Sequence, residues 1–412
     1  MKVTFLAGYF PPEKSADTHL NDDLVRDMAE YGATVEVIVP FPSRGLDEKQ
    51  IEKYEFLREE KIGENLTIHR VGKKTRFKKG LVSRGLAFLG KTLTLYRESQ
   101  KYDADCYFVV STPPFLGYFV KRLSKKAPVV YKLQDVFPDN LIEIKGWSEK
   151  NIIVKILRHM EKKVYQSASK ILVCSENVKN TIMVRGVEEE KIKVIHDWVD
   201  ENCCVPVDKN ENSLFEEFNI DRSKFTFTYA GNIGHMQNVN TILDAANIMR
   251  KKGSNAQIVV IGDGAWKNKM DERIDGEGIT NVIRVPMQPL DRVSMVYSSG
   301  DVGLVSLKPG VAKTALPSKT WSIMSAARPV ICEIDMDCEL VSIIHEHNCG
   351  VCVAPNDAEG MANAMLAMCE IEREELHNMG ASCRSYIVKE LNRKKTTRTC
   401  FEVLDKIVEG GK

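Results

Sequence analysis

The chain of 412 residues has almost no net charge, no long hydrophobic run and no regular cysteine pattern. Its formal net charge is +1, which argues against a nucleic-acid partner held by bulk charge. No stretch approaches the ~20 apolar residues of a membrane span, and the apolar run at the N-terminus is too short for a signal peptide. The 11 cysteines are odd in number and scattered, unlike a disulfide framework. These absences predict a cytoplasmic protein with reduced thiols.

Two kinds of binding site are also poorly represented. Neither "YAGNIG" nor "GDG" completes the G-x-G-x-x-G fingerprint of dinucleotide binding, so a nicotinamide dehydrogenase is disfavoured. Cys349 and Cys352 form a C-x-x-C pair without a second pair at zinc spacing, and we interpret them as buried thiols at the start of a strand. The D-x-D strings at 103–105 and 335–337 are interpreted as solvated turns. The sequence therefore predicts neither a metal site nor a cofactor.

Short apolar runs alternate with amphipathic stretches, which is the βαβ pattern of a parallel sheet covered by helices. The first series of predicted strands is Lys2–Ala7, Thr34–Val39, Cys106–Val110, Val129–Leu133, Lys170–Cys174 and Ile192–Ile195. The second series is Phe225–Ala230, Gln257–Ile261, Val282–Val285, Val302–Val305, Val330–Cys332 and Val351–Val353. The polar segment "ENCCVPVDKNENS" between them is the predicted linker. We therefore expect an α/β fold of two doubly wound domains, over residues 1–200 and 201–390.

Ligands of doubly wound sheets bind beyond the carboxyl ends of the strands, and the cleft between two such domains is the expected site. Gly231 and Gly234 follow one predicted strand directly, and Gly262 and Gly264 follow another. Glycines there would let the backbone approach a phosphate or a base closely. Taken alone, each glycine pair is better explained by a plain turn.

The stretch "LPSKTWSIMSAARPVI" places a lysine where a helix should begin. Pro317 is suited to the first helical position and residues 320–327 to the helix body, so Lys319 is expected in the first turn. The helix dipole disfavours a cation there by about 0.3–1 kcal/mol. Lys308 and Lys313 lie on the preceding loop, and a bound diphosphate would neutralise all three lysines while accepting backbone N–H groups. A lysine that extends into solvent is the alternative.

Several motifs, in order along the whole chain, resemble one family: "YFPPE", "DVFPD", "YAGNIG", "GDG", "SSGDVGLVSLKPG" and "PSKTWSIMSAARPVI". They are similar to the GT-B glycosyltransferases of glycosyltransferase family 4, and in particular to the bacterial capsule and O-antigen branch with its fucosaminyl- and colanic-acid-type enzymes. The resemblance implies two Rossmann-like domains facing across a cleft, with the acceptor on the first. It implies a nucleotide-sugar donor on the second, a UDP-sugar by preference, and metal-independent transfer with retention. Residues 391–412 are expected to form a helix that crosses back to the first domain.

The same resemblance gives roles to individual residues. The expected catalytic residues are Lys319, at the leaving diphosphate, and Asp135, which would orient or deprotonate the acceptor hydroxyl. An aspartate that caps a turn is the alternative for Asp135. The expected donor-binding residues are Gly231, Asn232, Gly234, Gly262, Asp263, Val285, Pro286, Lys308, Lys313, Pro317, Ser318 and Ser322. The expected acceptor-binding residues are Tyr9, Pro11, Pro12 and Glu13.

The sequence departs from the family pattern at several positions. Ser322 replaces the second member of a glutamate pair, and Gln134 replaces a histidine before the acidic residue. Asn232 and Gln237 stand where an arginine and a lysine are common, and the three lysines named above are expected to supply the missing positive charge. These changes leave two other functions open, a UDP-sugar epimerase of related fold and a non-catalytic nucleotide-sugar-binding protein.

One segment bears on the acceptor. From Lys73 to Ser99, "KKTRFKKGLVSRGLAFLGKTLTLYRES" alternates basic with apolar residues, as do segments that lie on an anionic membrane surface. A helix that buries its apolar stripe in the core is the alternative. The resemblance favours the membrane, because acceptors of this family are commonly sugars on a polyprenyl diphosphate. The expected partners are thus a nucleotide-sugar donor, a lipid-linked acceptor and the inner face of the cell membrane.

Overall fold

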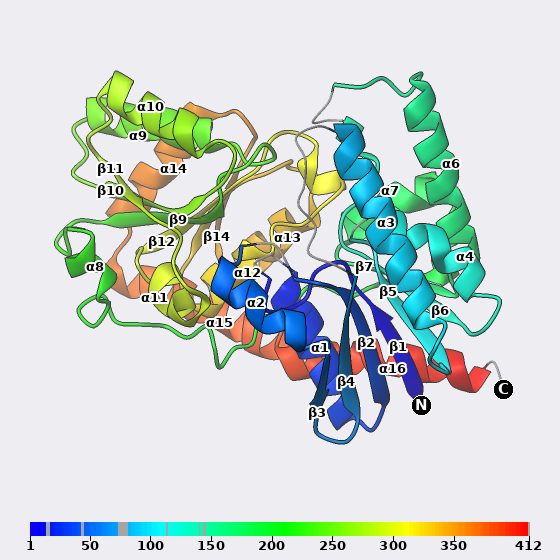
Figure 1. The fold of residues 1–412 in the computed structure, drawn as a ribbon. Helices are drawn as coiled ribbons and strands as arrows, with labels where there is room; N and C mark the ends of the chain where they lie inside the picture. Colours follow the sequence, from blue (N-terminus) through cyan, green and yellow to red (C-terminus); the bar gives the residue numbers. More distant parts are fainter. Residues whose placement is uncertain are drawn as a thin grey trace. The chain divides into compact units, whose positions relative to one another are not determined.

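The computed structural model describes residues 1–13, 17–42, 45–72, 81–112, 114–139, 141–142 and 146–410, without the side chains of 81–87, 114 and 115. It divides into two compact units, each an α/β domain with its own sheet (Figure 1). The first unit comprises Met1–Asp197 with Lys394–Lys412, and the second comprises Trp198–Arg393. None of the helices in the described ranges is both long enough and apolar enough to cross a bilayer.

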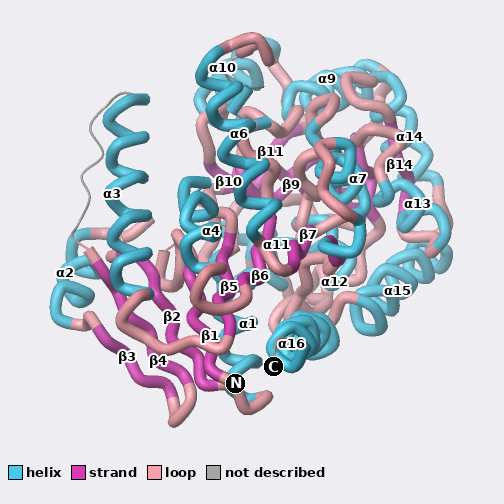
Figure 2. The backbone as a smooth tube through the Cα atoms, turned by 90° about the vertical axis from the view of Figure 1, so that its right-hand side faces the viewer, coloured by secondary structure: helices cyan, strands magenta, loops and turns pink. Residues whose placement is uncertain are grey.

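The first unit is built on an eight-stranded sheet of order β3-β4-β2-β1-β5-β6-β7-β8, and among its described strands only β3 runs antiparallel to its neighbour. Figure 2 shows β3, β4, β2 and β1 side by side at one end of this sheet. Its strands are β1 (Lys2–Leu6), β2 (Thr34–Pro40), β3 (Glu59–Ile62), β4 (Leu66–Val71), β5 (Cys106–Val110), β6 (Val129–Leu133), β7 (Lys170–Val173) and β8 (Ile192–Val194). The central strands are apolar and buried on both faces, as expected for a parallel sheet covered by helices. Six of the eight strands are predicted correctly, and β3 and β4 are missed.

The helices of this unit follow the strands in the order that the βαβ pattern predicts. They are α1 (Thr18–Glu30), α2 (Glu48–Phe56), α3 (Leu81–Ser99), α4 (Val120–Leu123), α6 (Ile152–Ser167), α7 (Glu176–Val184) and α16 (Arg393–Gly410). The last helix is fastened to the first. Asp27 of α1 is fully buried and accepts hydrogen bonds from Lys394 Nζ at 2.7 Å and Thr397 Oγ1 at 2.8 Å. The rings of Tyr31 and Phe401 pack beside these bonds, 5.5 Å apart.

The second unit has a six-stranded, fully parallel sheet of order β11-β10-β9-β12-β13-β14. Its strands are β9 (Thr226–Asn232), β10 (Gln257–Asp263), β11 (Val282–Val285), β12 (Val302–Ser306), β13 (Val330–Glu333) and β14 (Gly350–Val353). All six are predicted to within two residues at each end. The C-x-x-C pair lies in and beside β14 as two buried free thiols, which confirms the structural interpretation.

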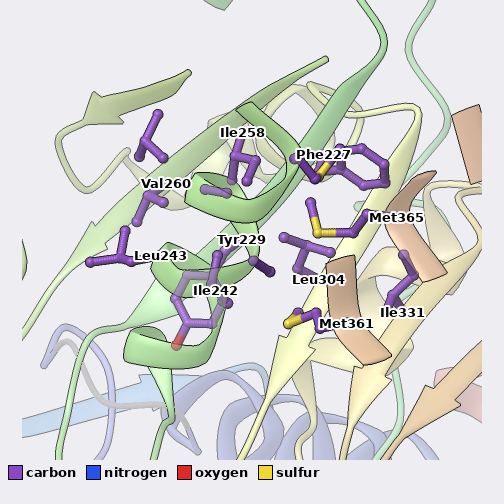
Figure 3. Packing of buried hydrophobic residues seen from close by; sticks show 14 of the residues in the cluster. Phe227, Tyr229, Ile242, Leu243, Ile258, Val260, Leu304, Ile331, Met361 and Met365 are labelled. Carbon is purple, nitrogen blue, oxygen red and sulfur yellow. The ribbon is translucent and has the colours of Figure 1, made fainter. Parts of the chain in front are cut away.

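Helices cover both faces of this second sheet. One face carries α9 (Val239–Lys251), α10 (Lys267–Glu277) and α14 (Ala358–Glu370), whose apolar side chains pack onto Tyr229, Val260 and Leu304 (Figure 3). The other carries α12 (Lys319–Ser325), α13 (Glu339–Glu346) and α15 (Arg373–Glu390). Two short helices, α8 (Leu214–Glu217) and α11 (Val293–Tyr297), contribute to a third cluster of buried residues.

The polar segment 201–213 contains no helix or strand, yet it is held firmly against the second unit. Arg384 of α15 donates to the backbone carbonyls of Glu201 and Cys204. Ser294 Oγ accepts a hydrogen bond from the amide of Val205. The segment predicted as a linker is thus a fixed strap on the second domain.

Candidate active site

Lys319 is the first residue of α12, and its side chain turns toward the end of β9. Its ammonium nitrogen lies 3.9 Å from the centroid of the Tyr229 ring. The nitrogen is buried and has no hydrogen-bond partner among the described residues. Burial therefore lowers the pKa of this lysine from 10.5 to about 7. A desolvated lysine nitrogen without a hydrogen-bond partner among the described residues would be stabilised in its charged form by a bound anion.

The helix begins later than expected. Ser318 is the N-cap residue, so Pro317 precedes the helix rather than opening it, and Lys319 takes the first helical position. The amides of Thr320 and Trp321 donate to the carbonyls of Pro317 and Ser318, within the turn itself. These two amides are therefore already paired, whereas the Lys319 ammonium has no hydrogen-bond acceptor among the described residues.

Gly231 brings the backbone of β9 next to that ammonium. Its φ is 124°, and a Cβ atom added there would lie 3.3 Å from Lys319 Nζ. Gly262, at the end of β10, is equally restricted because a side chain would overlap the Gly231 carbonyl oxygen. The amide of Ile233 donates to the Asp263 carbonyl at 2.8 Å and continues the pairing beyond the strands. The two predicted glycine loops therefore form one surface.

The other residues predicted to bind the donor differ in what they present to solvent. Gln237 Oε1 accepts from the Gly234 amide at 3.2 Å and from Asn232 Nδ2 at 3.4 Å, which fixes the loop. Asp263 is exposed, and Pro286 is exposed just beyond β11. Val285 is buried in the core, so its side chain does not reach the surface.

The two further lysines of the predicted cluster have contacts of their own. Lys308 Nζ lies 5.3 Å from the Trp266 ring centroid. Lys313 is exposed, and its Nζ lies 3.9 Å from Asp337 Oδ2. One turn along α12, the Ser322 hydroxyl is hydrogen-bonded to the Tyr297 phenol. Of the three lysines, Lys319 is the one with a buried nitrogen.

Glu333 is a buried acid at the end of β13 that the sequence analysis missed. It is fully buried, and burial raises its pKa. It accepts hydrogen bonds from the Ser306 hydroxyl, from Asn238 Nδ2 at 2.8 Å and from the Asn356 amide at 2.7 Å. These residues come from the end of β12, the start of α9 and the loop after β14. Glu333 therefore holds together the loops at the carboxyl edge of the second sheet.

In the first unit, Asp135 follows β6 at the carboxyl edge of the sheet. Asp135 is an exposed residue, yet the surrounding protein desolvates its carboxyl group and raises the pKa to about 6. The carboxylates of Asp17 and Asp197 act in the same direction. A carboxyl group that titrates close to neutral pH is suited to take a proton from a hydroxyl group.

Three titratable residues near Asp135 were not predicted, namely Asp197, Lys132 and His19. Asp197 Oδ1 lies 3.5 Å from Lys132 Nζ and accepts from Gln134 Nε2 at the same distance. His19 lies in the first turn of α1, and burial lowers its pKa. The nearby charges of Asp197 and Asp17 oppose that change without reversing it. Lys132 could have been recognised as a candidate from the sequence, because it is the one charged residue in the otherwise apolar strand "VVYKL".

The loop predicted to face the acceptor is held mainly through its backbone. The Tyr9 carbonyl accepts from Asn21 Nδ2 and the Pro11 carbonyl from Arg70, each at 3.3 Å. The peptide bond between Pro11 and Pro12 is cis. Glu13 is buried, and burial lowers the pKa of Lys91 on α3 while the Glu13 carboxylate opposes that change. The buried Glu13 carboxylate therefore interacts with Lys91 of α3 rather than with solvent.

The D-x-D strings are used structurally. Both carboxylate oxygens of Asp335 accept from the Gly310 amide at 2.9 Å, and Asp105 accepts from the Lys2 amide at 2.7 Å. Over the described part of the chain, no three His, Cys, Asp or Glu side chains gather as a metal site would require.

Comparison with known proteins identifies both domains. Residues 20–202 match the family model described as Glycosyltransferase Family 4, and residues 210–385 match the one described as Glycosyl transferases group 1. The probable glycosyltransferase WbjE of Pseudomonas aeruginosa is 25% identical over 75% of this chain and 77% of its own length. The putative colanic acid biosynthesis glycosyl transferase WcaI of Escherichia coli is 22% identical over 57% of this chain and 58% of its own length.

Solved structures show the same fold. The Anabaena protein Alr3699/HepE, in complex with UDP and glucose, aligns with a TM-score of 0.71 at 13% identity, over 98% of this chain and 100% of its own. The predicted GT-B fold of two Rossmann-like domains is thereby confirmed. The chain is thus a two-domain glycosyltransferase, with a family 4-type domain followed by a glycosyl transferases group 1 domain.

Proposed function

We propose that this glycosyltransferase moves a sugar from a nucleoside diphosphate sugar to a polyprenyl-diphosphate-linked sugar during synthesis of a bacterial surface polysaccharide. The main support for the donor half of this proposal is the ammonium of Lys319 beside Gly231, which is buried and has no hydrogen-bond partner in the described part of the chain. A diphosphate placed there would supply the negative charge that this cation lacks. The name of the relative WcaI supports a role in polysaccharide synthesis.

Donor and acceptor are assigned to separate domains in this proposal. The donor lies on the second domain, with its phosphates at Lys319 and its base near Asp263 and Pro286. UDP is the first candidate for the nucleotide because HepE, of the same fold, binds UDP. The acceptor lies on the first domain, between the Tyr9–Glu13 loop and Asp135. We assign the enzyme to the capsule and O-antigen branch, with transfer that retains configuration, on the basis of the family resemblance alone.

The proposed chemistry needs cations at the donor and a base at the acceptor. Cleavage of the bond between sugar and diphosphate leaves negative charge on the phosphate oxygen, and a preorganised cation stabilises that charge. Lys319 would take this role. Asp135, ionised above about pH 6, would accept the proton of the attacking hydroxyl. Metal independence is supported by the D-x-D carboxylates Asp105 and Asp335, which accept backbone hydrogen bonds.

Nucleotide binding is the first test. Thermal shifts with UDP, GDP, ADP and TDP, each with and without EDTA, are measured on the wild type and on Lys319→Met. We expect one diphosphate to stabilise the wild type with EDTA present and to lose most of that effect in the variant. Lys313→Met removes an exposed lysine of the predicted cluster from the loop before α12, and it tests whether the loss is specific to the buried Lys319. Absence of binding by all four nucleotides would overturn the proposal.

Turnover assays then separate the remaining functions. A transferase consumes the donor selected above only when a lipid-linked sugar is present, whereas an epimerase converts the donor without any acceptor. A non-catalytic binding protein would retain the nucleotide response and leave the donor unchanged. Acceptor-dependent release of the nucleoside diphosphate is the expected result.

Membrane contact is proposed for the first domain. Residues 73–80, the basic start of the predicted membrane segment, lie outside the described residues. On the described part of α3, Leu89 and Leu93 are 45% and 36% exposed. Ile152, Ile153 and Ile156 are also exposed at the start of α6. Apolar side chains on the surface beside basic residues support contact with an anionic bilayer.

Flotation with vesicles tests this contact. Wild-type protein is expected to float with vesicles that contain anionic lipid and to stay behind with neutral ones. Exchanging Lys73, Lys74, Lys78 and Lys79 for Gln should abolish flotation, because it removes the attraction to anionic lipid. Exchanging Lys125 and Lys126 in the same domain should leave it intact. The contact is ruled out if wild type and the fourfold variant both stay behind.

A further inference from the structure

A hollow lies in the second domain, away from the carboxyl edge of its sheet. It has a volume of about 480 Å³, within the usual range of small-molecule sites. Its walls come from α15, from the turn between α12 and β13 and from the strap before α8. The lining residues are Pro206, Ala327, Arg328, His377, Ala381, Arg384, Ser385 and Val388.

The close approach of α15 to that turn explains the shape of the hollow. Gly380 packs so tightly on the Ala327 carbonyl that any side chain at 380 would overlap it. Ala327 itself has a φ of 53°, in the left-handed region that non-glycine residues rarely occupy. Next to this contact, one face of α15 lines the hollow, because residues three or four positions apart lie on the same side of a helix. The residues on this face are at positions 377, 381, 384 and 388.

Two guanidinium groups line this hollow, and among the described residues neither forms an ion pair with a carboxylate, although the charges of Asp301 and Asp208 act on Arg328 at longer range. Within the continuously described residues 146–410, Arg328 Nε is buried without a hydrogen-bond partner. Arg328 donates its one described side-chain hydrogen bond to the Val207 carbonyl at 2.9 Å. Arg384 donates to neutral oxygens of Glu201, Cys204 and Ser325. The nearby carboxylate of Asp301 is paired with Lys209 instead, at 3.0 Å.

Such an arrangement has a direct consequence for ligand binding. Burying a guanidinium group without a counter-charge is unfavourable, and an oxyanion that accepts from its free N–H groups relieves that cost. The rest of the lining combines the apolar side chains of Pro206, Ala381 and Val388 with two polar ones, His377 and Ser385. We infer that this hollow binds a small organic anion, with its phosphate or carboxylate head at Arg328 and an apolar body along α15.

This site is separate from the proposed donor site. Lys319 begins α12, whose seven residues span about 10 Å, and Arg328 follows three residues after the helix ends at Ser325. Arg328 precedes β13 at the amino edge of the sheet, whereas the glycine loops lie at the carboxyl edge. A ligand of the hollow therefore leaves the donor loops uncovered.

Calorimetric titrations with phenyl phosphate and with benzoate test the inference at constant ionic strength. The Lys319→Met protein is used as the background, so that phosphate binding at the donor site does not contribute. We expect saturable binding of at least one probe, and the preferred probe identifies the head group. Ala381→Trp, which fills the hollow from an exposed position of α15, should weaken binding at least tenfold. Asn378→Trp, exposed on the same helix and outside the lining, should not.

Arg328→Gln provides a second variant, and a loss of roughly tenfold or more is expected because a charge-assisted hydrogen bond is removed. If this variant does not fold, the Ala381→Trp and Asn378→Trp pair still decides the matter. The inference fails if neither probe binds saturably, or if both tryptophan variants bind the probe as tightly as the background protein does.

Discussion

A Lys319→Met variant is expected to unfold at a higher temperature than the wild type and to transfer sugar roughly 100- to 1,000-fold more slowly. The loss corresponds to the ~2.7–4 kcal/mol typical of removing one preorganised group that stabilises a developing oxyanion. The gain in stability, about 1–3 kcal/mol, arises because methionine replaces a buried cation for which the described residues supply no hydrogen-bond partner. Calorimetric melting and initial rates with saturating acceptor measure the two effects.

The stability difference should depend on pH in a defined direction. Lys319 titrates near 10.5 when unfolded and near 7 when folded, because burial lowers its pKa. Between these values the unfolded chain binds more protons, so wild-type stability rises with pH relative to the variant. The variant should therefore be most favoured below pH 7, and its advantage should disappear toward pH 10.5.

Lys313→Met is the control for both measurements. Lys313 belongs to the same predicted cluster but is exposed and lies 3.9 Å from Asp337. Surface substitutions of this kind usually change stability by less than about 0.5 kcal/mol. Equal losses of activity in Lys313→Met and Lys319→Met would contradict a specific role for the buried ammonium.

The sequence predicted the strands wherever apolar runs stand alone between polar segments. Twelve of the fourteen strands have this pattern, and both sheets could be recognised from it. The missed strand β3 reads "EEKI" and alternates between exposed and half-buried residues at the edge of its sheet. An edge strand with one apolar residue carries no periodic signal, and its neighbour β4 mixes apolar residues with threonine, histidine and arginine.

The candidate site was predictable only in part. Lys319 stood out because a cation at the start of a helix violates a local rule, and such violations mark functional positions. The contact between Lys319 and the Tyr229 ring could not be predicted, because the two residues are 90 positions apart in the sequence. They meet only through the packing of α12 beside the end of β9. The same holds for Asp17, Asp135 and Asp197, which three separate loops bring to one edge of the first sheet.

Exchanging Asp135 for asparagine is expected to lower kcat by 10²–10⁴, the usual contribution of a general base. Nucleotide affinity should be unchanged, since the variant alters the acceptor domain alone. The wild-type rate should fall as the pH drops below about 6, where the Asp135 carboxylate becomes protonated. That acidic limb of the pH profile should be missing from the residual activity of the variant.

Asp17→Asn gives the sharper version of this test. Asp17 raises the pKa of Asp135 through its negative charge, and asparagine removes that charge while remaining a good residue for the N-cap of α1. The acidic limb should therefore shift to lower pH, with the rate at neutral pH retained. A merely structural role for Asp135 would leave the limb in place in this variant. An unshifted limb, or an Asp135→Asn enzyme of full activity, would show that another group takes the proton, and His19 would be the next residue to exchange.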